Sequence, residues 1–160
     1  MTVADVLAII ISVIALGFSL YQFFVERKRN RDEATINALA ELQKEVLNQE
    51  EFVNANVSGI LSTHKSFPAG RTDENWEKIS ESLARIEQFA VGVNAGVYNL
   101  EILDRMAGSH ILKEFYRYKP IIDYKRKVGN TNKRYIEFES MANSLKKYNP
   151  DIKPSDASIK

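Results

Sequence analysis

An apolar run near the start of the sequence constrains the fold more than any other feature. Val6 to Val25 is a stretch of about 20 residues without a formal charge. As a helix rising about 1.5 Å per residue, it would be about 30 Å long, which matches the hydrocarbon core of a bilayer. A cleaved signal peptide needs a basic leader, whereas Met1 to Asp5 carries only an acid. The run therefore predicts an uncleaved single-pass transmembrane anchor.

The residues after the run predict the orientation of this anchor. A basic cluster follows at Arg27, Lys28, Arg29 and Arg31. Cations in such positions stay on the cytoplasmic side of a membrane and lie near the lipid headgroups. We therefore expect residues 1–31 to form the anchor with its basic stop, with the N-terminus outside and the rest of the chain in the cytoplasm.

One face of the predicted anchor differs from the rest. Small or polar side chains recur at alternating spacings of three and four residues, which places them on one side of a helix. This small-residue stripe consists of Asp5, Ala8, Ser12, Ala15, Ser19 and Gln22, and Glu26 continues it. In lipid, small residues let two helix backbones approach and polar side chains can bond across the contact. We interpret the stripe as a packing face for a second copy or another membrane protein, with a chance arrangement of small residues as the alternative.

The remainder of the sequence predicts an all-α fold: one transmembrane helix, then a cytoplasmic bundle of about four to five helices. The expected parts are a long juxtamembrane helix at 32–63, a helical bundle at 74–148 and a flexible tail at 149–160. Leu39, Val46, Val53 and Ile60 recur every seven residues. This repeat fits either the edge of a bundle helix, which we favour, or a coiled-coil seam.

Caps and breakers predict the boundaries of the later helices. A helix begins near Glu74, and its apolar positions continue to Val97. Asn99 is expected to cap a short helix that Gly108 ends, and Ser109 to cap the next one, which Pro120 should kink or split. A last helix is expected at about Lys133 to Tyr148.

Residues with catalytic or metal-binding potential are sparse. The sequence has no cysteine, and its two histidines, His64 and His110, lack partners at metal-ligand spacing. No nucleotide-binding, hydrolase or zinc-protease motif occurs. Glu81 and Arg85 have the spacing of a helix ion pair, and we expect Glu87 to pair with Arg85 or Arg105. These observations predict a protein that is not an enzyme and holds neither metal nor cofactor.

Positive charge gathers in the last third of the chain. From His110 to Lys160 there are twelve Lys or Arg and six Asp or Glu, and tyrosines are interleaved with the cations. The candidate anionic-surface patch is Arg117, Lys119, Lys125, Arg126, Lys127, Lys133 and Arg134. It could contact an anionic leaflet or nucleic acid, or be a solvated basic face. Of the two functional interpretations we favour the lipid surface, and we do not expect a nucleic-acid partner.

Three segments between Ile86 and Lys127 carry a family resemblance: "FAVGVNAGVYN", "ILDRMAG" and "YKPII". This region resembles the core of a bacterial domain-of-unknown-function family that joins one N-terminal membrane helix to a small helical cytoplasmic domain. The resemblance implies an all-α protein of the bacterial inner (plasma) membrane. It brings no catalytic residues, and the occurrence of such proteins on mobile elements suggests an antiphage role.

Together these features favour a non-enzymatic membrane-anchored module. It would self-associate, or bind a membrane or cytoplasmic partner, as an accessory, scaffold or sensor subunit. The alternative is a membrane-disrupting effector whose oligomers line a pore with the small-residue stripe. An enzyme without a recognisable motif is a third hypothesis, and no residue indicates a small-molecule ligand.

Overall fold

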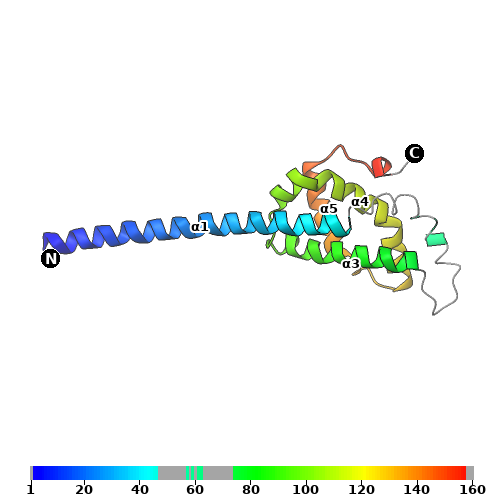
Figure 1. Ribbon diagram of the computed structural model, residues 1–160, viewed down its shortest axis with the longest axis horizontal. Coiled ribbons are helices and arrows are strands. Elements are labelled where there is room, and N and C mark those ends of the chain that lie inside the picture. The colour runs from blue at the N-terminus through cyan, green and yellow to red at the C-terminus, as the bar shows by residue number, and fades with distance from the viewer. Residues whose placement is uncertain (1, 47–56, 58, 60, 63–73, 158–160) are drawn as a thin grey trace.

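The computed structural model describes residues 2–46, 57, 59, 61–62 and 74–157. Within these residues the chain is all-helical, as predicted. The elements are α1 (Val3–Glu45), α3 (Glu74–Asn94), α4 (Leu100–Val128), α5 (Ile136–Tyr148) and a 3-10 helix, η2 (Pro154–Ala157). The first half of α1 projects away from a bundle that its second half forms with α3, α4 and α5 (Figure 1).

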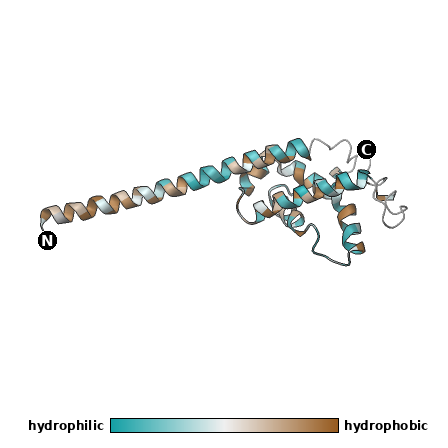
Figure 2. Cartoon of the chain, turned by 60° about the horizontal axis from the view of Figure 1, so that its bottom comes forward, coloured by the Kyte–Doolittle hydropathy of each residue, from teal (hydrophilic) through white to brown (hydrophobic). Residues whose placement is uncertain are grey.

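The predicted anchor and the start of the predicted juxtamembrane helix form one continuous helix. α1 has 43 residues, which corresponds to about 65 Å at about 1.5 Å per residue. Its projecting half carries most of its apolar residues (Figure 2). α1 ends at Glu45; the expectation that it continues toward Thr63, like the repeat positions Val53 and Ile60, falls largely outside the described residues.

The last three turns of α1 belong to the hydrophobic core of the bundle. Thr35, Leu39 and Leu42 are buried, as is Val46 directly after the helix, and this part of α1 packs against α3 and α4. α5 packs against the same two helices. The seven-residue repeat therefore places Leu39 and Val46 inside the bundle, as favoured, and not on an external seam.

α3 begins at Glu74, as predicted. Its apolar residues recur at spacings of three and four and therefore form one continuous buried face. The buried residues are Trp76, Ile79, Ser82, Leu83, Ile86, Phe89, Ala90 and Val93. Val97 was expected to extend this face, but it lies beyond the helix and is 57 % exposed. Gly96, with φ +72°, lets the chain turn back in the left-handed region that favours glycine.

α4 is a single helix of 29 residues, and this contradicts two predictions. Gly108 and Ser109 lie inside it and do not separate two helices. A Cβ at Gly108 would overlap the Asp104 carboxylate, which accepts a hydrogen bond from Asn149, so glycine leaves room for this contact. Pro120 does not split the helix: it lies on the exposed face, while buried side chains on both sides hold the helix to the core.

The end of the chain also differs from expectation. α5 begins at Ile136, three residues later than predicted, after Tyr135 adopts a left-handed conformation with φ 56°. Beyond α5, where a flexible tail was expected, η2 packs against α4 and Ala157 is buried. The Arg117 guanidinium donates a hydrogen bond from Nε to the Ala157 carbonyl at 3.3 Å. This contact ties the tail to the bundle through Ala157.

Candidate membrane anchor and interaction surfaces

The projecting half of α1 has the length and composition of a membrane span. Its apolar window has a mean hydropathy of 2.2, and none of that window is buried by the rest of the chain. A core helix of a soluble protein would be covered by its neighbours, whereas Ile11, Val13 and Ile14 are each more than 60 % exposed. Among the described residues this is the one helix long and apolar enough to cross a membrane.

The small-residue stripe lies along this projecting half. Ala8, Ser12, Ala15, Ser19 and Gln22 are all exposed, and Asp5 belongs to α1 although its side chain is outside the described part. The Ser12 hydroxyl donates a hydrogen bond to the Ala8 carbonyl at 2.8 Å. That hydroxyl is therefore satisfied within the helix and needs no water or partner.

The stripe and the bundle lie on opposite sides of α1. Ala8, Ser12 and Ala15 each precede a buried residue of α1 by 27 positions, namely Thr35, Leu39 and Leu42, and Ser19 precedes the buried Val46, directly after α1, by the same number. At about 3.6 residues per turn, 27 residues make about seven and a half turns, which reverses the direction of a side chain. The continuation of the stripe, at Glu33, Asn37, Ala40 and Lys44, is exposed as well. The bundle therefore leaves this whole side of α1 uncovered.

A polar joint connects α1 to α4 where α1 enters the bundle. The basic cluster at Arg27, Lys28, Arg29 and Arg31 is exposed on α1 just before this point. The Asn99 backbone N–H donates to the buried Thr35 hydroxyl at 2.7 Å, and the Asn99 side chain donates to Asp32 at 2.5 Å. Asn99 also caps α4, as predicted, because its side-chain oxygen accepts from the Glu101 N–H at 3.0 Å.

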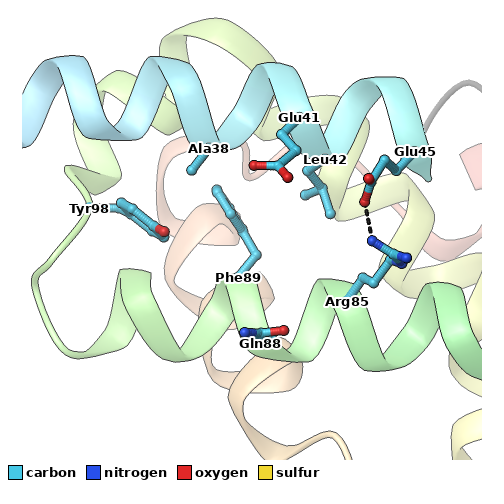
Figure 3. Close-up of a pocket in the computed structure, with 8 residues that line it drawn as sticks. All are labelled: Ala38, Glu41, Leu42, Glu45, Arg85, Gln88, Phe89 and Tyr98. Carbon is cyan, nitrogen blue, oxygen red and sulfur yellow. Dashed lines mark hydrogen bonds and ion pairs between the residues drawn. The ribbon is translucent and has the colours of Figure 1, made fainter.

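A shallow groove separates α1 from α3 (Figure 3). Its volume is about 200 Å³, which is below the about 300–1,000 Å³ that is usual for small-molecule sites. Arg85 closes one end by an ion pair with Glu45, and it also pairs with Glu81 at 3.0 Å as predicted. At the other end the Tyr98 ring stacks on Phe89 with centroids 5.2 Å apart. The groove joins the two helices and does not favour a ligand.

Glu87 has a role that the sequence analysis missed. Arg85 and Arg105 pair with other carboxylates, so the ion pair expected for Glu87 does not form. Its carboxylate instead accepts hydrogen bonds from the backbone N–H groups of Glu137 at 3.1 Å and Phe138 at 2.8 Å. These are donors of the first turn of α5, whose own cap residue, Tyr135, makes no capping hydrogen bond with its side chain. Glu87 therefore caps α5 from α3.

Three cations of the candidate anionic-surface patch are engaged in ion pairs. Arg117 pairs with Glu114, which is 2 % exposed and was not singled out from the sequence. Lys119 pairs with Asp123 at 2.6 Å, and Arg126 pairs with Glu139 at 2.8 Å. These cations mainly neutralise local carboxylates. The patch is thus smaller than the sequence indicated.

The remaining patch residues lie at the end of the bundle far from the projecting half of α1, which we call the distal end. Arg31 and Glu45 are about 21 Å apart along α1, and Arg85 of α3 pairs with Glu45. Trp76 lies about 13 Å further along α3, and the Lys125 ammonium is 4.9 Å from the Trp76 ring centroid. The screening length in physiological salt is only about 8 Å. A membrane around the projecting half would therefore exert little electrostatic attraction on Lys125, which weakens the lipid-surface interpretation of the patch.

The described residues offer no candidate metal-binding cluster. Among the residues that the structure describes, no group of three or more His, Asp or Glu side chains could hold a metal ion. His110 lies within α4, and His64 is outside the described residues. A single histidine is not sufficient to indicate a catalytic site.

Fold and surfaces together define a class: an all-helical protein with one candidate membrane helix that continues into a small bundle. The chain belongs to the DUF4760 family, described as a domain of unknown function, which matches residues 9–145. The matched range includes both the projecting half of α1 and the bundle. No curated protein and no solved structure matches the chain.

Proposed function

We propose that this protein is a non-enzymatic module of the bacterial inner membrane that pairs with another transmembrane helix through the small-residue stripe. The observation that carries the proposal is the position of the stripe on the side of α1 opposite to the bundle. A second helix could run along this side from Ala8 to Lys44 without meeting α3, α4 or α5. A stripe on the bundle side would be obstructed where α1 enters the core.

The spacing of the stripe favours a left-handed pair. Alternating steps of three and four residues average 3.5, and a 3.5-residue repeat on helices of 3.6 residues per turn produces a left-handed supercoil. Most transmembrane helix pairs cross with this hand. Beyond Arg31 the same side of α1 is polar, at Glu33, Asn37 and Lys44, so the close contact would be confined to the membrane.

The proposed partner is a second copy of the chain, and the proposed orientation keeps the bundle in the cytoplasm. Arg27, Lys28, Arg29 and Arg31 support this orientation, since basic residues beside a span stay inside. The continuity of α1 suits an accessory or sensor subunit, because any rotation of the membrane helix would turn the buried residues Thr35 and Leu39 with it. The satisfied Ser12 hydroxyl favours helix packing over a water-lined pore.

Single-cysteine cross-linking in membranes tests the pairing directly, because the natural chain contains no cysteine. Ala8→Cys, Ser12→Cys and Ala15→Cys should form disulfide-linked dimers on mild oxidation. Ile10→Cys and Gly17→Cys, at matched depths on the other side of α1, are the controls and should form few. Ser12→Ile combined with Ser19→Ile should weaken the dimer captured at Ala15→Cys.

Equal cross-linking at all five positions would indicate random collision and would overturn the pairing. Links from the stripe to a different protein would replace the second copy by a heterologous partner. Dye release from vesicles that is lost in Gln22→Leu would favour the pore alternative. Labelling of Ser109→Cys by an impermeant thiol reagent in intact cells would contradict the proposed orientation.

A further inference from the structure

A group of cations at the distal end has no carboxylate partner among the described residues. This cationic tip consists of Lys125, Lys127, Lys133 and Arg134, from the last turn of α4 and the loop before α5. Lys127, Lys133 and Arg134 are exposed. Arg134 donates a hydrogen bond to the Lys125 carbonyl at 3.5 Å, which draws the two ends of the loop together. Four positive charges therefore converge on one short turn.

The surroundings of Lys125 indicate how positive this region is. Its ammonium lies against the rings of Trp76 and Tyr135, and it donates to the Ser80 hydroxyl at 2.7 Å. Burial and, secondly, the charge of Arg134 lower the pKa of Lys125 to about 8. The nearest groups are thus rings, hydroxyls and another cation, and an anion brought to this turn would meet uncompensated charge.

The geometry of the tip selects among anionic partners. It lies at the distal end, so a membrane around the projecting half is about four screening lengths away. Nucleic-acid binding would need free rings for bases, but Tyr118 is buried, Tyr124 packs edge-on against Trp76 and Tyr135 contacts Lys125. A short acidic peptide segment needs neither lipid nor stacking. It needs only a few cations and hydrogen-bond donors.

We propose that the cationic tip is a docking site for an acidic segment of a partner protein. A hollow of about 460 Å³ beside the tip is lined by Arg126, Lys127, Asn130, Thr131 and Asn132, with Asp123 at its edge. Its amide, hydroxyl and cationic groups can bond both the carboxylates and the backbone of an extended peptide. Asp123 is paired with Lys119 and Arg126 with Glu139, so Lys127 gives the hollow a net positive charge. This site is independent of the pairing proposed for α1.

The test measures binding of a fluorescent ten-residue polyglutamate peptide to the full-length protein in nanodiscs of neutral phosphatidylcholine. Lys127→Glu combined with Lys133→Glu should weaken peptide binding more than tenfold at low salt, because two of four attractive charges become repulsive. The matched control, Lys146→Glu with Lys147→Glu, makes the same net change in the exposed last turn of α5. It should change binding less than twofold.

Three results would overturn the proposal. They are no peptide binding by the natural protein, an equal loss in the control variant, and tighter binding of a ten-nucleotide deoxythymidine strand than of the peptide. The third result would assign the tip to nucleic acid. Circular dichroism of both variants must match that of the natural protein, and Lys127→Ser with Lys133→Ser, which adds no repulsion, should give an intermediate loss.

Discussion

Lys125 is a lysine whose chemistry depends on residues far from it in the sequence. Trp76 and Ser80 come from α3, and Tyr135 comes from the loop before α5. From the sequence, Lys125 is one cation in a basic run and is expected to be exposed. The fold instead half-buries its ammonium between rings, where the charged form is disfavoured.

This environment predicts an unusual pH dependence of stability. The pKa of Lys125 is lowered from 10.5 to about 8 in the folded protein. Between these values the unfolded chain still binds a proton that the folded chain has released, so the free energy of unfolding should rise from about pH 8 to pH 10. Lys125→Met should lack this rise. Urea unfolding followed by the fluorescence of Trp76, the single tryptophan, measures it.

The measurement should stop near pH 10, because burial raises the pKa of Tyr118 and of Tyr135. Above their ordinary pKa of 10 these tyrosines stay protonated longer in the folded state, which lowers stability as the pH rises further. The same slope in the natural protein and in Lys125→Met would show that Lys125 does not titrate in this window.

At the scale of elements, α5 depends on a neighbouring helix for its first turn. Its preceding loop residue Tyr135 offers no cap, and Glu87 of α3 accepts the hydrogen bonds of the Glu137 and Phe138 N–H groups. Asn94 of α3 also donates to the Glu137 carbonyl at 3.0 Å. α3 therefore fixes both the start and the position of α5.

Removing this cap should destabilise the bundle. Glu87→Ala leaves two backbone N–H groups without their acceptor, and we expect a loss of about 1–2 kcal/mol in the free energy of unfolding. Glu87→Gln, which keeps one oxygen acceptor, should lose less. The control Glu81→Ala breaks an exposed helix pair and should cost under about 0.5 kcal/mol. Chemical denaturation gives these values, and equal losses for both alanine variants would contradict the capping role.

At the scale of the whole molecule, α1 combines an uncovered apolar half and a half that packs into the bundle. Its first half is uncovered, and its last turns supply Leu39 and Leu42 to the core, followed by Val46 directly after the helix. Fully burying an aliphatic side chain contributes about 1.5–3 kcal/mol, and whole domains are stable by only about 5–15 kcal/mol. The bundle should therefore not survive the loss of the second half of α1.

Truncation tests this division of α1. A chain of residues 32–160 keeps the buried part of α1 and should be soluble, helical and cooperative in unfolding. A chain of residues 47–160 lacks Thr35, Leu39, Leu42 and Val46 and should be largely unfolded or aggregated. Circular dichroism and size-exclusion chromatography distinguish the two chains. A folded 47–160 chain would show that α1 is only attached to the bundle.

The sequence by itself determined the features that depend on neighbouring residues. The length and apolarity of Val6 to Val25 define a candidate membrane span, the apolar spacing from Trp76 onward defines α3, and Asn99 caps the helix that follows it. In each feature the physical cause, whether burial along one face or a local hydrogen bond, acts within a few turns of helix. Such causes can be identified without knowing which other elements lie nearby.

The tertiary structure alone decided the features that depend on contacts between distant segments. Gly108 and Pro120 have the local character of helix breakers, yet buried neighbours keep α4 continuous. Glu87 and the tail at Ala157 acquire their partners only when α3, α4 and α5 pack together. The side of α1 that remains open also depends on where the bundle attaches. These outcomes are set by burial and hydrogen bonds between segments 40 or more residues apart, which local sequence patterns do not record.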